Sequence, residues 1–184
     1  MVHLFWDNSN IHYVGLNHVF PIKDQGINQG RYRTHFKNLF ELVRNQRVVK
    51  TAVVAGSVPP PSDSIWDHIR SLGVNLKLLN RDSNNKEVGL DETIQTFLLR
   101  TMIDVRPPET IALLTGDGAG DEVGIGFLAD LKRAHSLGWQ VEVYSWDAGC
   151  KKELREFAEQ NGTYYKLEDF YNHITFIEGG RRPT

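Results

Sequence analysis

Cysteine is nearly absent from this chain, since Cys150 is the only one among 184 residues. A single cysteine excludes an intramolecular disulfide framework and fits a reducing compartment. The chain also lacks any apolar run approaching the roughly 20 residues that cross a bilayer, and its start does not read as a signal peptide. We therefore expect a soluble intracellular protein, cytoplasmic or nuclear, without a membrane partner.

An excess of one charge sign is missing as well. The chain has 21 Lys and Arg against 23 Asp and Glu, a formal net charge of -2. This balance gives no general attraction to polyanions, so binding of nucleic acid needs a local basic patch or a bound cation. The length suits one domain with a single core. We expect this domain to span residues 1–177, with 178–184 as a flexible tail because that segment has no apolar periodicity.

Strand-like and helix-like patterns alternate along the chain without hairpin signals. Strands are expected near His3 to Trp6, Val48–Ala55, Val74–Leu79, Ile111–Leu114, Gln140–Trp146 and Thr163–Leu167. Helical spacing is expected at Phe36–Val43, Ile65–Leu72, Leu90–Met102, Val123–Ala134 and Lys151–Gln160. The polar stretch from His12 to Gly30 predicts a long loop or a short irregular helix. The pattern favours an α/β fold with a mostly parallel sheet covered by helices on both faces.

Acidic residues follow or adjoin several of these elements. Asp7 ends the first apolar run and is followed by Asn8, Ser9 and Asn10. Asp117 follows the Ile111 strand in the same way, and Asp91 opens a predicted helix. Ligands bind at the carboxyl ends of strands in open α/β sheets. We therefore expect these acids to gather at one edge of the sheet.

Each acid also has a purely structural interpretation. Asp7 could hydrogen-bond its own turn, Asp91 could cap its helix, and Asp117 could be a turn residue. Asp121 is either a fourth ligand or another cap. Asn10 and Thr115 are candidates for supporting a ligand or a water, and Asn8 is a further candidate for contacting substrate.

Clustered carboxylates repel one another, so three or four at one edge need a counter-charge. Mg²⁺ or Mn²⁺ accepts oxygen ligands and is typically held by one or two carboxylates together with substrate phosphate oxygens. Such an ion activates water and neutralises developing charge, which suits hydrolysis of a phosphodiester.

Other kinds of site do not fit the spacing. The glycine-rich Gly116–Gly120 lacks the ending of a nucleotide-binding P-loop and does not give the dinucleotide fingerprint. The seven histidines are scattered and have no cysteine partners, which argues against zinc. Cys150 has no evident base beside it, so a structural role is favoured, and the alternation of the first strand places Trp6 in the core.

With these residues in place, the chain resembles the NYN domain family, the LabA-like branch of the PIN-like ribonuclease superfamily. The matching segments are Phe5–Ile11, Gly56–Pro60 with Ile65 and Trp66, Lys86–Asp91, Leu114–Asp117 and Gly138–Trp146. The resemblance covers about 170 residues.

The resemblance implies a three-layer α/β/α sandwich, PIN-like, with RNA as substrate and a divalent-metal site. Asp7, Asp91 and Asp117 match the family's acids. The chain departs from the family's compact Gly-Asp-x-Asp-Phe after Asp117, which leaves open whether Asp121 supplies a fourth acid. Cys150 stands where relatives commonly carry serine.

RNA binding implies positive charge near the acids. Arg81 and Lys86 are the first candidates because their loop leads into Asp91, and Lys151 and Lys152 are the next. Solvated loop charge is the competing interpretation for all four.

The sequence thus predicts a metal-dependent ribonuclease with Asp7, Asp91, Asp117 and Asp121 as Mg²⁺ or Mn²⁺ ligands and Asn10 in support. Two alternatives stay open: a non-catalytic RNA-binding or scaffold module, and a phosphatase, which Ser9 disfavours because aspartyl-phosphate enzymes carry an aspartate there. A homodimer or further domains in a longer protein are also compatible with the sequence.

Overall fold

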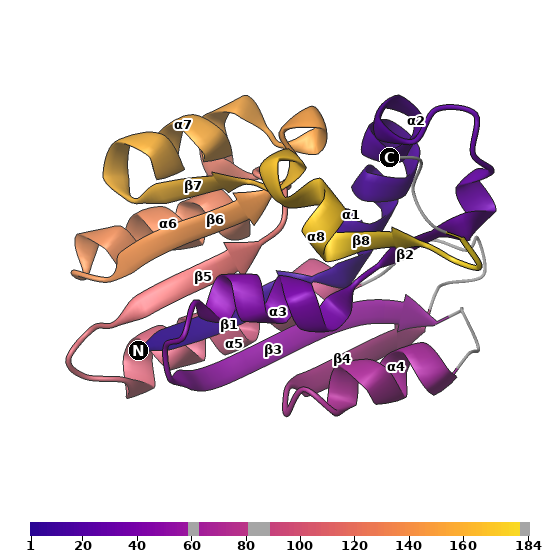
Figure 1. The fold of residues 1–184 in the computed structure, drawn as a ribbon. Coiled ribbons are helices and arrows are strands. Elements are labelled where there is room, and N and C mark those ends of the chain that lie inside the picture. The colour runs from indigo at the N-terminus through magenta and orange to yellow at the C-terminus, as the bar shows by residue number, and fades with distance from the viewer. Residues whose placement is uncertain (59–62, 81–88, 181–184) are drawn as a thin grey trace.

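The protein is built around a six-stranded parallel sheet in the order β4-β3-β1-β5-β6-β7 (Figure 1). The computed structural model describes residues 1–58, 63–80 and 89–180. The strands are β1 (Val2–Asp7), β3 (Val49–Val58), β4 (Asn75–Asn80), β5 (Thr110–Leu114), β6 (Gln140–Ser145) and β7 (Thr163–Lys166). The predicted three-layer α/β/α sandwich with a mostly parallel sheet is confirmed.

Strand β1 lies in the middle of the sheet and is buried along its whole length. Its side chains alternate, so Leu4 and Trp6 pack into one core cluster and Phe5 packs into the other. A strand covered on both faces reads as a continuous apolar run because neither face meets water. This is why the segment is recognisable in the sequence, and Trp6 is fully buried as expected.

Two helical layers cover the sheet (Figure 1). The layer that shares its core with Leu4 and Trp6 contains α1 (Asn8–Val14), α3 (Phe36–Arg44), α4 (Asp63–Arg70) and α8 (Tyr171–Ile174). The opposite layer contains α5 (Leu90–Asp104), α6 (Gly126–Ser136) and α7 (Lys152–Asn161). Among the described residues, no helix combines the length and the apolar character that a membrane span requires.

The stretch from His12 to Gly30 is mostly helical, so of the two predicted alternatives the long loop was wrong and the irregular helix is confirmed. Helix α1 continues into a π-helical turn, η1 (Gly15–Val19), then into α2 (Phe20–Lys23), and a 3₁₀ turn, η2 (Gln29–Arg31), follows. Val19 and Phe20 are buried and anchor the segment to the core. Intervening polar residues obscured that anchor in the sequence.

A small second sheet was not predicted. Strands β2 (Tyr32–Thr34) and β8 (Thr175–Ile177) pair antiparallel. Because these strands lie far apart in the sequence, no turn signal marks the pairing.

Val123 was expected on the buried face of a helix, and the structure contradicts this. Helix α6 begins only at Gly126, and Val123 lies in the 3₁₀ turn η3 (Asp121–Val123) with 69% of its surface exposed. Gly120 and Gly124, on either side of that turn, have left-handed backbone with φ of 86° and 72°. Such conformations break a right-handed helix, so the apolar spacing that includes Val123 is accidental.

The strand order creates a switch point between β1 and β5. The chain runs from β1 outward through β3 and β4, then returns to the other side of β1 and runs outward through β5, β6 and β7. The crevice outside the carboxyl ends of the strands at such a reversal is where open α/β sheets bind ligands. Asp7 and Thr115 lie at the ends of the two strands that flank it.

Replacing Leu4 by Ala tests the central core. Leu4 is fully buried, so we expect the free energy of unfolding to fall by about 2–5 kcal/mol, measured by urea denaturation. The same truncation of Ile103, which is 70% exposed, is the control, with an expected change within about 0.5 kcal/mol. Equal losses for both variants would contradict the core assignment.

Three histidines are held neutral by their surroundings. His3 is fully buried in β1, with Nδ1 3.0 Å from Thr51 Oγ1 and Nε2 3.1 Å from Glu109 Oε2. Burial lowers the pKa of His3 more than Glu109 raises it. Burial is also the main cause that lowers the pKa of His12 and His35. Protonation of these rings therefore favours the unfolded chain.

We expect the protein to lose stability as the pH falls from 7 to about 5. The three pKa values are lower in the folded state than in the unfolded chain, where a histidine titrates near 6.5. The stabilisation is complete above that value and is lost as the pH falls through the folded values. Urea denaturation at each pH measures it, and a His12→Gln variant should show a shallower decline. Stability that stays constant or rises toward pH 5 would contradict this account.

Candidate active site

Asp7 is the centre of the site. It is 4% exposed at the end of β1 and caps helix α1, with Oδ1 accepting a hydrogen bond of 2.9 Å from the backbone N–H of Asn10. Its other oxygen, Oδ2, accepts a hydrogen bond of 3.2 Å from the Thr115 hydroxyl. The structural interpretation of Asp7 is therefore correct in part. A carboxylate has about four lone-pair sites, so it can accept more than two bonds.

Asn10 and Thr115 tie the ends of β1 and β5 together. The side-chain oxygen of Asn10 accepts a hydrogen bond of 2.8 Å from the backbone N–H of Gly116. Thr115 Oγ1 accepts one of 3.2 Å from the backbone N–H of Asp117. Both residues thus hold the backbone around the acids, and their expected role in supporting a ligand or a water stays a prediction.

Asn8 contributes a buried acceptor. It is 7% exposed at the start of α1, and its Oδ1 has no hydrogen-bond partner in the part of the chain that the structure describes. Its Cβ lies beside Gly56, where an added Cβ would stand 3.8 Å away. A buried oxygen without a partner is costly unless water or a ligand satisfies it.

Asp117 and Asp91 come from two further elements of the fold. The half-buried Asp117 follows β5, and its Oδ1 accepts a hydrogen bond of 2.9 Å from the backbone N–H of Ala119. The half-buried Asp91 is the second residue of α5. The cap of that helix is Gly89, with φ of 78°, so Asp91 is not the cap that its position suggested.

Asp121 lies in the glycine-rich loop that follows Asp117. Its Oδ2 is 2.5 Å from Nζ of Lys132, in helix α6. The side chain of Arg133 holds the same loop by donating to the carbonyl oxygen of Gly124 at 2.5 Å. Asp121 thus makes an ion pair with α6, and the pairing gives it a structural role that the sequence did not predict.

The donor set of the site is oxygen-rich and suits a hard cation such as Mg²⁺ or Mn²⁺. Among the described residues, however, no group of three or more His, Cys, Asp or Glu side chains is arranged to hold a metal ion. Mg²⁺ usually keeps several waters and takes one or two protein carboxylates. The residues therefore fit a site of that open kind, and the described part of the chain holds no preformed cage of three acids.

The predicted basic residues fall into two groups. Lys151 and Lys152 are exposed before and at the start of α7, and the Lys151 side chain passes close to Gly118, where an added Cβ would be 3.1 Å from its own Cβ. Lys152 lies 3.5 Å from Glu156. Arg81 and Lys86 lie outside the described residues. Positive charge therefore stands beside the loop that carries Asp117.

Cys150 is half-buried next to this loop, and its thiol lies 3.5 Å from the carbonyl oxygen of Lys151. Burial raises the pKa of the Cys150 thiol. A thiol that stays protonated at neutral pH is a poor nucleophile, so the structural role expected for Cys150 is the better interpretation.

Asp147 and Glu168 were missed as site-related residues. Asp147 comes directly after the apolar strand that ends at Trp146, the same pattern that singled out Asp7 and Asp117. Glu168 is brought to it only by the fold.

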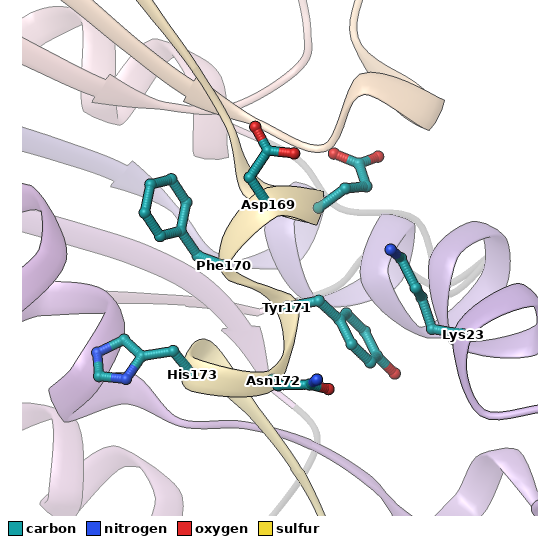
Figure 2. Close-up of a pocket in the computed structure, with 7 residues that line it drawn as sticks. Lys23, Asp169, Phe170, Tyr171, Asn172 and His173 are labelled. Carbon is teal, nitrogen blue, oxygen red and sulfur yellow. The ribbon is translucent and has the colours of Figure 1, made fainter. Parts of the chain in front are cut away.

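A cavity of about 450 Å³ lies between α2 and the segment 168–173, and Glu168 is one of the residues that line it (Figure 2). Lys23 faces it from α2, and Asp169 and Phe170 line it on the other side. None of the acids predicted from the sequence lines it. Its charges are of both signs, so it does not single out a ligand.

The sheet order and the buried Asp7 at its switch point define a three-layer domain of the PIN-like kind. A model of the NYN domain family matches residues 1–167, and the chain belongs to this family, whose domains are of the PIN-like nuclease type. No curated protein matches the chain.

A similar solved structure is a protein of unknown function from Vibrio parahaemolyticus. It is 16% identical, covers 91% of this chain and 93% of its own, and has a TM-score of 0.65. At this identity the likeness shows the fold alone.

Gly116→Ala tests how tightly the site loop is packed. An added Cβ would stand 2.6 Å from the carbonyl oxygen of Gly149 and 2.9 Å from Ser145 Oγ, so we expect a loss of about 1–3 kcal/mol in the free energy of unfolding. The control is Gly30→Ala, where the nearest atom is the side-chain oxygen of Asn28 at 3.1 Å. If denaturation curves give the same small loss in the free energy of unfolding for Gly116→Ala as for the control, the tight contact at Gly116 is contradicted.

Proposed function

We propose that this NYN domain is a divalent-metal-dependent ribonuclease whose site centres on Asp7. The observation that supports the proposal best is a buried carboxylate held by Asn10 and Thr115 at the switch point of the sheet. Burying a charged side chain is costly, and a ligand at this crevice gives a reason for keeping it there.

Asp7, Asp91 and Asp117 are the residues that would hold Mg²⁺ or Mn²⁺. The bound ion would supply polarisation of the phosphodiester, activation of water and neutralisation of the transition-state charge. Asn10 and Thr115 fix the Asp7 carboxylate. The Asn8 Oδ1, which has no hydrogen-bond partner among the described residues, would accept a hydrogen bond from water or substrate. Asp121 is less suited to be a ligand while Lys132 is bonded to it.

RNA is the substrate we propose because the family is of the nuclease type. The net charge of the chain is slightly negative and gives no general attraction to RNA. A polyanion then needs local cations, and Lys151 supplies one beside the Asp117 loop, with Lys152 next to it in the chain. Arg81 and Lys86 precede Asp91 in the sequence and are proposed to add to this charge.

Asp7→Asn is the sharpest test of catalysis. The substitution keeps the size of the side chain and its ability to cap α1 but removes the charge, so we expect kcat on single-stranded RNA with Mn²⁺ to fall by roughly 100-fold or more. End-labelled RNA resolved on a denaturing gel measures it. The matched control is Asp104→Asn, at the other end of α5 from Asp91, which should cleave like the wild type.

Residual cleavage that is the same for wild type and Asp7→Asn would contradict the ribonuclease proposal. The second candidate is an RNA-binding module without catalysis, which the lack of a preformed three-acid group among the described residues favours. RNA binding that is unchanged by EDTA and by Asp7→Asn, with no cleavage, would establish this alternative. Release of phosphate from a generic monoester would point to a phosphatase.

A further inference from the structure

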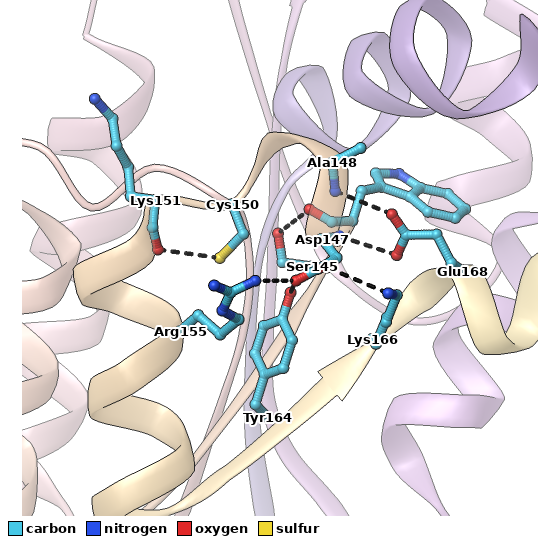
Figure 3. A network of polar contacts seen from close by, with 10 residues as sticks. Ser145, Asp147, Ala148, Cys150, Lys151, Arg155, Tyr164, Lys166 and Glu168 are labelled. Carbon is cyan, nitrogen blue, oxygen red and sulfur yellow. Dashed lines mark hydrogen bonds and ion pairs between the residues drawn. The ribbon is translucent and has the colours of Figure 1, made fainter. Parts of the chain in front are cut away.

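A second polar cluster lies beside the site, around the 3₁₀ turn η4 (Asp147–Gly149) that follows β6 (Figure 3). Glu168, just beyond the end of β7, binds the start of this turn with both of its oxygens. Oε2 accepts a hydrogen bond of 2.9 Å from the backbone N–H of Asp147, and Oε1 accepts one of 3.1 Å from the N–H of Ala148. One carboxylate thus satisfies two N–H groups that the turn leaves without partners.

The side chain of Asp147 fixes the same turn from the other direction. Its Oδ1 is 2.6 Å from Arg155 Nη1 in α7, and its Oδ2 is 3.2 Å from Lys166 Nζ in β7 (Figure 3). The Tyr164 hydroxyl lies 3.5 Å from Oδ1. Hydrogen bonding to Arg155 is the main cause that lowers the pKa of Asp147, so this carboxylate is charged at neutral pH and ties the turn to two neighbouring elements.

The turn reaches the candidate site through Gly116. The backbone N–H of Lys151 donates to the carbonyl oxygen of Gly116 at 2.9 Å. On the other side, the N–H of Gly116 donates to Asn10 Oδ1 at 2.8 Å, and the N–H of Asn10 donates to Asp7. A continuous series of contacts therefore leads from Glu168 to the Asp7 carboxylate.

The turn packs tightly against Gly116. An added Cβ there would stand 2.6 Å from the Gly149 carbonyl oxygen and 3.1 Å from Cys150 Cα. Close-packed groups transmit a displacement to their neighbours instead of absorbing it. A shift of the turn would therefore move Gly116 and, through Asn10, change the setting of Asp7.

We propose that Glu168 and Asp147 are positioning residues of the active site. They hold the turn at 147–151, which fixes Gly116 and presents Lys151 at the rim of the site. This inference rests on the proposed ribonuclease function. It adds that the rate of cleavage depends on a carboxylate that touches neither the RNA nor the ion.

Glu168→Ala and Glu168→Gln test the inference in the whole chain with single-stranded RNA and saturating Mn²⁺. The alanine variant loses both acceptors, so we expect kcat to fall by roughly 10- to 100-fold with KM for RNA changed less than about threefold. The glutamine variant keeps one oxygen in place and should recover a large part of the rate.

The matched control is Glu142→Ala. Glu142 accepts two hydrogen bonds from Arg47, of 2.7 and 2.9 Å, and one of 3.0 Å from the Tyr144 hydroxyl. Within the part of the chain that the structure describes, none of these side-chain bonds leads to Gly116. We expect this variant to lose thermal stability while keeping the wild-type kcat. If Glu168→Ala lowers kcat no more than Glu142→Ala does, Glu168 is merely structural and the inference is overturned.

Amide hydrogen exchange without RNA separates this inference from the proposed function. In Glu168→Ala, the N–H groups of Gly116 and Lys151 should exchange roughly tenfold faster or more, because the turn that holds them is released. Unchanged exchange at both amides would overturn the inference even if the wild type cleaves RNA. If the two amides exchange faster in Glu168→Ala but the wild type cleaves no RNA, Glu168 holds the turn at 147–151 and the ribonuclease proposal is rejected.

Discussion

The burial of the Asp7 carboxylate is the constraint on which the rest of the site depends. A charged group that is only 4% exposed must be satisfied by fixed donors. The backbone N–H of Asn10 and the hydroxyl of Thr115 provide them. The donors come from the start of α1 and the end of β5. The two bonds that satisfy the Asp7 carboxylate therefore also hold α1 and β5 together at the switch point.

Around Asp7 the site is held together mainly by hydrogen bonds of the backbone and less by contacts between acids. Gly116 has a neighbour on each side, Asn10 and Lys151, and the absence of a side chain at Gly116 is what lets the turn at 147–151 approach. The acids are then distributed: Asp117 serves its own turn, Asp121 pairs with Lys132, and Asp91 stands in the first turn of α5. A site built in this way is open, and its oxygen atoms suit an ion that retains waters of its own.

One interpretation from the sequence failed for a clear reason. Val123 matched a helical apolar spacing but is exposed, whereas Asp121, close to it in the chain, pairs with Lys132 and stays a predicted metal ligand. Both lie in the glycine-rich loop that the structure folds as a 3₁₀ turn with left-handed glycines. Periodicity arguments assume one regular backbone. Where glycine allows several backbone conformations, tertiary contacts decide where a side chain lies. Here Asp121 pairs with Lys132, and Val123 is exposed to solvent.

The sequence alone determined the α/β/α class, the positions of the central strands and the edge of the sheet at which Asp7 and Asp117 stand. It could do so because burial on both faces and the alternation of strands and helices are visible in the local order of apolar and polar residues. Only the tertiary structure decided that Thr115 bonds Asp7, that Gly89 and not Asp91 caps α5, and that Glu168 grips the turn at Asp147. These contacts join residues from separate elements, and their geometry depends on how strands and helices pack, which no local pattern encodes.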